Sequence, residues 1–190
     1  MFNFRLNFLL FLEEQQLIQQ LQNNDTRESA FRFLVTTYQK RLYIHIRSML
    51  LNHEDTDDVL QNTLIKVYQN IHNFKGESQL FSWIYRIATN EALTHLKKQA
   101  KSNQVSITEY NQAQVENLRA DPLFDGDEAF LQLQKAVAKL PEKQQLVFKM
   151  RYFEELDYKK IAEILDTSVG GLKASYHHAV KKIELYLKSN

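Results

Sequence analysis

The sequence LDYKKIAEILDTSVGGLKASYHHAVKKI, residues 156–183, decides the fold of the C-terminal part of the chain. Asp157 is placed to cap a short helix, and Ala162 is the small residue that two closely crossing helices require. A tight turn at residues 166–168 follows, and Ser168 can cap the next helix. This spacing predicts a helix-turn-helix, a motif whose second helix enters the major groove of DNA.

Gly170 and Gly171 are half of the four glycines in the chain. Each glycine in a helix interior costs about 1 kcal/mol relative to alanine. The pair falls in the first turn of the predicted second helix, where this penalty is smaller. Because glycine has no side chain, the backbone N–H groups there can come close to a phosphate. The pair therefore indicates a helix N-terminus that DNA approaches.

His177 and His178 follow on the same helix. As neighbours in sequence they point about 100° apart, so they cannot chelate one metal ion as an i, i+4 pair would. We expect one ring to face DNA or solvent and the other to lean toward the base of the helix, with two ordinary surface histidines as the alternative, and we predict no metal site.

The composition sets limits on function. The chain has 190 residues and 44% hydrophobic content, enough for one large or two small domains. Cysteine is absent, which excludes disulfides, thiolate metal sites and a cysteine nucleophile, and we expect a cytoplasmic protein. The net charge of +1 does not by itself indicate nucleic-acid binding, so that function must rest on motifs.

The first residues, MFNFRLNFLLFLEEQQLI, are strongly apolar. The run ends at Glu13, short of the roughly 20 residues that a membrane span needs, and no small-residue cleavage site follows. We expect a helix that packs on the first domain and no membrane contact. A partner-docking segment and an upstream extension are the alternatives.

Apolar residues recur at helical spacing along most of the chain, and no alternating strand pattern is present. We predict helices from Arg27, from the capping sequence at residues 52–58 to Asn70, and over residues 80–98. The first of these carries an apolar stripe of Ala30, Phe31, Leu34, Tyr38, Leu42, Ile46 and Met49.

Residues 100–127 lose this periodicity, and in residues 101–127 Asp and Glu outnumber Lys and Arg by 5 to 2. The predicted fold is all-α, with two small helical domains at residues 1–99 and 128–190, a flexible acidic linker at residues 100–127, and a helix-turn-helix in the second domain.

Two blocks, residues 55–99 and 140–187, together resemble bacterial RNA polymerase sigma factors of the extracytoplasmic-function group. The resemblance extends over residues 28–188. It implies that an acidic helix in the first block docks on the clamp of the polymerase large subunit. The matching positions are Asp58, Gln61 and Thr63, and Asp57 is assigned to the same contact, while Asn62 stands where the family usually has Glu. The two aspartates could instead compensate the dipole at the helix N-terminus.

The resemblance also implies that a loop and the helix after it recognise and melt the minus-ten promoter element. Melting requires polar contacts and stacking for a base that has left the duplex. The residues this assigns are Asn73, Lys75, Gly76, Glu77, Ser78, Gln79, Arg86 and Asn90. We expect Trp83 to pack in the core rather than to stack on a base.

The second block resembles the family region that recognises the minus-thirty-five element. The residues assigned there are Ser168, Gly170, Gly171, Lys173, Ser175, Tyr176, His177, His178, Lys181 and Lys182. The family tends to carry arginines along this helix, where this chain has Ser175, His178 and Val180, and each bidentate arginine–guanine pair contributes roughly 1–3 kcal/mol of discrimination. We therefore predict weak minus-thirty-five recognition, with promoter choice resting on the minus-ten element or on a DNA-bound recruiting protein. The alternative is that Tyr176, His177 and His178 read a different upstream element with full affinity. Asp166 and Glu155 replace usual turn glycines.

The sequence thus favours a sigma factor that binds core RNA polymerase, through its clamp and flap, and promoter DNA. The resemblance implies no catalytic residue, cofactor or metal, and it leaves room for an anti-sigma factor. One alternative is a helix-turn-helix regulator that acts without polymerase. Another is an all-α hydrolase using His45, His53, His72 and His95, although no HExxH spacing is present.

Overall fold

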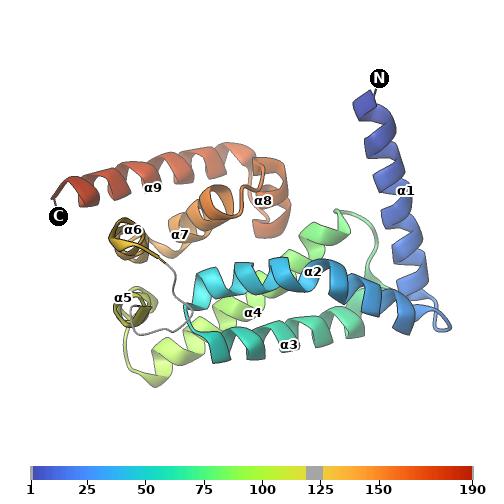
Figure 1. Ribbon diagram of the computed structural model, residues 1–190, viewed down its shortest axis with the longest axis horizontal. Coiled ribbons are helices and arrows are strands. Elements are labelled where there is room, and N and C mark those ends of the chain that lie inside the picture. The colour runs from blue at the N-terminus through green and yellow to red at the C-terminus, as the bar shows by residue number, and fades with distance from the viewer. Residues whose placement is uncertain (1, 119–125, 190) are drawn as a thin grey trace.

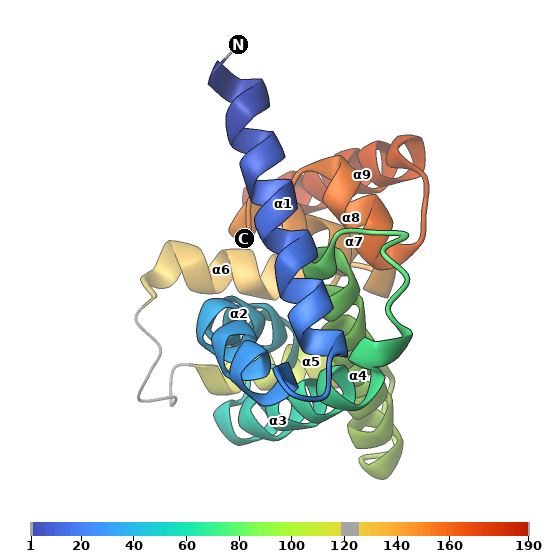
Figure 2. The same ribbon diagram turned by 90° about the vertical axis from the view of Figure 1, so that its right-hand side faces the viewer.

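The computed structural model describes residues 2–118 and 126–189, with side chains from Leu12 onward. Within these ranges the chain is helical and contains no strand, as predicted. The N-terminal helices are α1 (Phe2–Gln22), α2 (Arg27–Leu50), α3 (His53–Asn70) and α4 (Leu80–Ser102), with a short 3-10 turn η1 (Ile71–Asn73) before α4. Helices α2, α3 and α4 lie side by side, and the N-terminal part of α1 projects beyond them (Figures 1 and 2).

The sequence pattern explains these helices. The predicted stripe of α2 is confirmed, because all seven of its residues are buried or half-buried. Asn52 caps α3 by accepting a hydrogen bond from the Asp55 N–H at 2.9 Å, as the capping sequence predicted. Helix α1 has 21 residues, and Ile18 and Leu21 are buried against the first domain, as expected for a helix that packs there. None of the described helices is long and apolar enough to cross a membrane.

The segment predicted as a linker contains a helix, α5 (Ile107–Asn117), which starts at a capping box formed by Ser106 and Glu109. Its apolar positions, Ile107, Val115 and Leu118, are at helical spacing. Asn111 interrupts this pattern in the sequence. In the structure Asn111 is buried because its amide donates to Gln145 Oε1 at 3.1 Å. The helical pattern of apolar residues was therefore hard to recognise in the sequence, because a buried, hydrogen-bonded asparagine occupies one of its positions.

The C-terminal helices are α6 (Glu128–Ala138), α7 (Glu142–Phe148), α8 (Tyr158–Leu165) and α9 (Val169–Ser189), with a wider π-type turn η3 (Lys149–Phe153) after α7. Asp157 caps α8 through the Lys160 N–H at 2.9 Å, as predicted. Asp166 ends that helix in the left-handed conformation with φ 49°, and Glu155 adopts φ 55° in the preceding turn. Both replacements of glycine are therefore accommodated by strained but allowed backbone.

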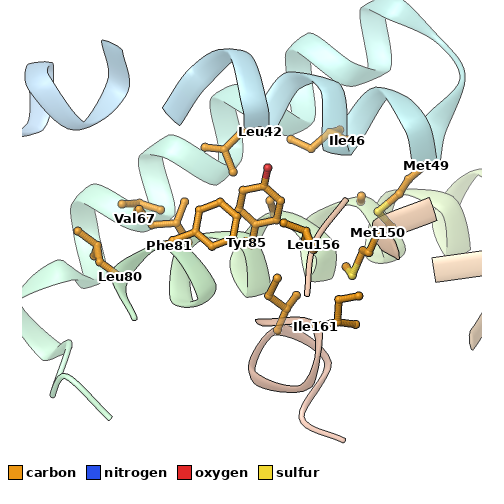
Figure 3. Close-up of a cluster of buried hydrophobic side chains, with 14 of the residues drawn as sticks. Leu42, Ile46, Met49, Val67, Leu80, Phe81, Tyr85, Met150, Leu156 and Ile161 are labelled. Carbon is orange, nitrogen blue, oxygen red and sulfur yellow. The ribbon is translucent and has the colours of Figure 1, made fainter. Parts of the chain in front are cut away.

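The two halves of the chain share one hydrophobic core. Leu42, Ile46, Met49, Val67, Leu80, Phe81 and Tyr85 from α2, α3 and α4 lie in the same cluster as Met150, Leu156 and Ile161 from the C-terminal half (Figure 3). Tyr85 is the largest fully buried side chain in this cluster, and its ring lies 4.2 Å from that of Phe81. Burial of this apolar surface holds α8 against α4.

Polar side chains lie inside the contact between the halves. His45 Nδ1 of α2 is 2.8 Å from Glu154 Oε1, with side chains only 1% and 6% exposed. The other ring nitrogen of His45 lies 2.9 Å from Thr89 Oγ1 on α4. Lys149, beside Glu154, is buried, and desolvation lowers its pKa to about 8 although the Glu154 carboxylate partly opposes this shift. The contact therefore carries a buried charge that is costly near neutral pH.

Replacing Lys149 by methionine tests that cost. The lysine has a pKa of about 8 in the folded protein and 10.5 when unfolded. Between these values the unfolded chain binds more protons, so this group makes the free energy of unfolding rise with pH. Lys149→Met should be more stable than wild type near pH 7, by on the order of 3 kcal/mol at most, and the difference should shrink toward about pH 10. Urea unfolding across this range measures it.

Lys159→Met is the matched control, because Lys159 is exposed one helix away. Its difference from wild type should stay small and independent of pH. A Lys149→Met variant that is less stable than wild type at pH 7 would show that the ammonium group stabilises the contact.

Candidate nucleic-acid interface

The loop between η1 and α4 presents a polar tip. Gly76 adopts φ +73°, a conformation that favours glycine, and so it makes the turn. Lys75, Glu77 and Gln79 are exposed, whereas Phe74 and Leu80 at the two ends of the loop are buried. Among the described residues, the polar side chains of residues 75–79 have no hydrogen-bonding partner. The tip therefore offers donors and acceptors that are available to a ligand.

A cavity of about 350 Å³ opens beside this loop, between α3 and α4. Its size is within the range of small-ligand pockets. Trp83 forms an apolar wall and packs against Phe74 with ring centroids 5.2 Å apart. Lys66 Nζ and Glu91 Oε1 form an ion pair of 2.5 Å at its edge. The lining residues are Lys66, Asn70, Asn73, Trp83, Ile87, Asn90 and Glu91. An indole face among amides and charges suits an unstacked base.

The structure brings together only part of the set predicted for the minus-ten element. Asn73 and Asn90 both line the cavity. Arg86, one turn before Asn90, is turned away, because its guanidinium donates to the main-chain carbonyl of Glu163 in α8. Trp83 is half-buried, so it packs on Phe74 as expected and also faces the cavity.

Sequence analysis missed four lining residues: Lys66, Asn70, Ile87 and Glu91. A signal for them was present. Lys66 and Asn70 are four residues apart on one helix, and Trp83, Ile87 and Glu91 are at the same spacing on the next. Two such stripes on neighbouring helices are expected to face each other.

Helix α3 presents a continuous exposed face. Asp57, Asp58 and Gln61 are exposed on it, as a partner contact requires. Ile65 and Tyr68 extend the face at helical spacing and are 47% and 40% exposed, a surface that the sequence analysis missed. Exposed apolar side chains beside acidic ones are typical of a protein–protein contact.

Thr63 corrects one assignment on this helix. Its side chain is fully buried, and its hydroxyl donates to the Val59 carbonyl at 2.7 Å. It therefore presents nothing to a partner in this structure. Its spacing from Val59 and Val67 places it on the core stripe, which explains why a threonine hydrogen-bonded within its own helix is tolerated there.

The structure explains glycine at one of the two positions at the start of α9 and not at the other. Ser168 Oγ accepts a hydrogen bond from the Gly171 N–H at 3.2 Å, which confirms the predicted cap. A Cβ on Gly171 would lie 3.2 Å from this same oxygen, so the cap itself favours glycine. A Cβ on Gly170 would meet nothing within 4 Å. The chain therefore gives no internal steric reason for glycine at position 170.

The outward face of α9 is basic and histidine-rich. Lys173, His177, His178, Lys181 and Lys182 are all exposed, and Ser175 is half-buried. The expectation that one histidine leans toward the helix base was wrong, because both rings lie outside the core.

Tyr176, assigned to this face by resemblance, belongs mainly to the core. Its ring stacks on that of Phe148 at 5.9 Å and meets Tyr158 edge-on at 6.3 Å. Burial raises its pKa above the usual value, with the neighbouring Tyr158 adding to the shift. Val180 likewise packs against the C-terminal core cluster. Val180 is therefore half-buried at the edge of the core rather than fully displayed on the outward face.

The histidines of the hydrolase alternative are scattered. His45 is buried with Glu154, and His95 lies 3.0 Å from Asp55. In the described part of the chain, no three His, Asp or Glu side chains converge in a way that could hold a metal ion.

Comparison with known proteins identifies the two halves. Residues 34–102 match the family described as Sigma-70 region 2, and residues 130–183 match Sigma-70, region 4. The ECF RNA polymerase sigma-E factor of Haemophilus influenzae is 31% identical, with 91% of this chain and 94% of that protein covered. The RNA polymerase sigma-H factor of Pseudomonas aeruginosa is 28% identical, with 93% and 94% covered.

Two solved structures share the fold. One shows CnrH in complex with the cytosolic domain of CnrY, with a TM-score of 0.69, 19% identity, and 93% of this chain and 98% of that chain covered. The other shows the sigma factor RpoE with the anti-sigma factor NepR from Bartonella quintana, with a TM-score of 0.63, 19% identity, and coverage of 83% and 96%. Together with the matched regions and the relative above 30% identity, these findings show that the chain belongs to the extracytoplasmic-function group of the sigma-70 family.

Proposed function

We propose that the chain is a dissociable promoter-specificity subunit, which binds core RNA polymerase, directs it to promoters and promotes DNA opening without catalysis of its own. The observation that carries this proposal is the presence, in one chain, of a polar cavity beside an exposed loop and of a separate helix-turn-helix. A regulator that only binds duplex DNA has no use for the cavity. Because the work is done on the chromosome with polymerase, we place the protein in the cytoplasm.

The division of labour follows from the exposed faces. We assign polymerase binding to the face of α3 that carries Asp57, Asp58 and Gln61, extended by Ile65 and Tyr68. Residues 1–99 would also hold the minus-ten element, with the extruded base in the cavity against Trp83. Residues 128–190 would place the N-terminus of α9 in the major groove, where the backbone at Gly170 lies open to a phosphate.

Arg86 adds a condition to this mechanism. Its guanidinium is held by the Glu163 carbonyl while α8 packs on α4. This bond turns the guanidinium toward α8, while the other N–H groups of Arg86 take no part in it. We propose that Arg86 reaches the minus-ten element when α8 leaves α4, with the two halves separating on polymerase.

The solved relatives support a further partner. Both were obtained as complexes, one of them explicitly with an anti-sigma factor. We propose that an anti-sigma factor also controls this chain, in addition to a DNA-bound recruiting protein suggested by the arginine-poor α9.

Transcription by core RNA polymerase with and without the chain tests the proposed function. Start sites mapped by sequencing should appear only when the chain is added. Selective binding of duplex promoter DNA by the chain alone, with no effect on the polymerase, would instead support the helix-turn-helix regulator.

Asp58 and Gln61 test the polymerase interface. Asp58→Ala with Gln61→Ala should weaken binding to core polymerase by tenfold or more, because both exposed side chains lie on the proposed contact. The change in folding stability should stay within about 0.5 kcal/mol, as is usual for exposed positions. Titration of a labelled chain with core enzyme measures the affinity. Gln39→Ala, exposed on α2 and outside the α3 face, is the control, and equal affinity of all three proteins would refute the assignment.

The loop tip tests the assignment of DNA melting. Replacing Lys75, Glu77, Ser78 and Gln79 together by alanine should leave polymerase binding intact, because none of them lies on the α3 face. It should abolish permanganate reactivity of thymines near the start site, because an extruded base then lacks its polar contacts. Unchanged permanganate reactivity would refute the role of the loop tip in melting, and loss of polymerase binding would mean that the loop belongs to the polymerase contact.

The basic face of α9 tests promoter selectivity. A transcription library with a randomised upstream element should give a flat minus-thirty-five profile with the wild-type chain, because Ser175 and His178 replace arginines. Ser175→Arg with His178→Arg should restore selectivity, since each arginine–guanine pair adds roughly 1–3 kcal/mol of discrimination. A sharp upstream motif obtained with the wild-type chain and core polymerase alone would contradict weak recognition.

A further inference from the structure

Residues of α1 contact both ends of the loop at residues 74–79, and the proposed function gives this helix no role. Figure 2 shows α1 descending in front of the molecule to the point where this loop runs up toward α4. Ile18 and Leu21 anchor that part of α1 in the core. The Thr26 hydroxyl and the Arg27 guanidinium bind the carbonyls of Gln20 and Leu21, and so they secure its last turn. This part of α1 is therefore a fixed support.

Gln22 holds the beginning of the loop. Its amide nitrogen donates to the Ile71 carbonyl at 3.2 Å and to the Phe74 carbonyl at 2.8 Å. The Ile71 carbonyl, at the start of η1, also accepts the Phe74 N–H at 3.1 Å, and Phe74 is the first residue after η1. A single side chain thereby fixes the direction in which the backbone leaves Phe74.

Glu14 holds the end of the loop. Helix α4 starts after Gln79, which provides no side-chain cap. The Glu14 carboxylate accepts a hydrogen bond from the Leu80 N–H at 3.2 Å. Glu14, which lies 66 residues earlier in the chain, therefore caps this helix in place of Gln79. A negative charge at a helix N-terminus also interacts favourably with the helix dipole.

Between these two attachments the loop tip makes no side-chain hydrogen bond of its own among the described residues. Its geometry therefore depends on where its ends are held. Phe74, held through its carbonyl by Gln22, packs against Trp83, which is a wall of the cavity. Any shift at Phe74 would reach the cavity through that contact.

We propose that Glu14 and Gln22 are positioning residues, which hold the two ends of the loop and thereby set the selectivity of the cavity for minus-ten bases. This inference rests on the proposed function, because it gives α1 a role in the same site. This positioning role is distinct from a contribution to folding stability. The two side chains set the geometry of the loop, and the loop tip itself contributes nothing to the core.

The test compares Glu14→Ala with Gln22→Ala against Gln16→Ala with Gln19→Ala, two exposed glutamines of the same helix. Ile183→Val, a small deletion in the core of α9, controls for lost stability at a distance from the loop. Glu14→Gln keeps an acceptor oxygen and is the conservative variant. Two readouts are used: the base preferences in a library of minus-ten sequences transcribed by core polymerase, and the hydrogen exchange of the Leu80 amide in the free chain.

Glu14→Ala with Gln22→Ala should flatten the minus-ten preference by about tenfold, the size expected when a hydrogen bond of this class is lost at each end. Leu80 exchange should rise in this variant and be largely rescued by Glu14→Gln. The glutamine control and Ile183→Val should keep wild-type preferences. Unchanged preferences and unchanged Leu80 exchange in the double variant, with an active wild-type chain, would overturn the inference. A wild-type chain that programs no transcription would overturn the proposed function, whatever the exchange data show.

Discussion

The packing of α8 against α4 is the contact on which the rest of the structure depends. Leu156 and Ile161 complete a core that already contains Tyr85 and Phe81, so neither half buries its apolar surface alone in this arrangement. The same contact decides which functional surfaces are accessible. It holds Arg86 against α8 and leaves the α3 face, the loop tip and the outward face of α9 exposed. The folded chain therefore exposes most, but not all, of the residues proposed to contact polymerase and DNA.

Polar groups inside this contact make it specific rather than strong. The Thr89 hydroxyl donates its proton to the Tyr85 carbonyl at 2.8 Å, so the Thr89 oxygen accepts a hydrogen bond from His45. The other ring nitrogen of His45 is hydrogen-bonded to Glu154. Such a network is satisfied only in one register, whereas apolar side chains alone could pack in several. Among the described residues Glu154 Oε2 has no hydrogen-bonding partner, and the buried Lys149 lies beside this carboxylate. An unsatisfied oxygen and a buried lysine lower the cost of separating the halves, because water can solvate both groups on opening.

Local signals predicted the fold well, and contacts between distant segments escaped them. Caps at Asn52, Asp157 and Ser168 could be located because a cap is defined by residues within three positions of each other. Helix α5 was missed because Asn111 occupies a position on its apolar stripe. The cavity was half predicted: Asn73 and Asn90 came from the resemblance, while Lys66 and Glu91 required knowing that α3 and α4 are neighbours. The bond of Arg86 to Glu163 joins positions 77 residues apart, and no local pattern contains it.

The structure gives different explanations for Gly170 and Gly171 in α9, although the two are adjacent in the sequence. Gly171 is explained within the chain, because a side chain there would crowd the oxygen of the Ser168 cap. Gly170 is exposed and unobstructed, so an alanine would fit and would favour the helix. The folded chain itself therefore contains no steric reason for glycine at position 170. The proposed approach of a DNA phosphate to this helix N-terminus, near Lys173, would supply one.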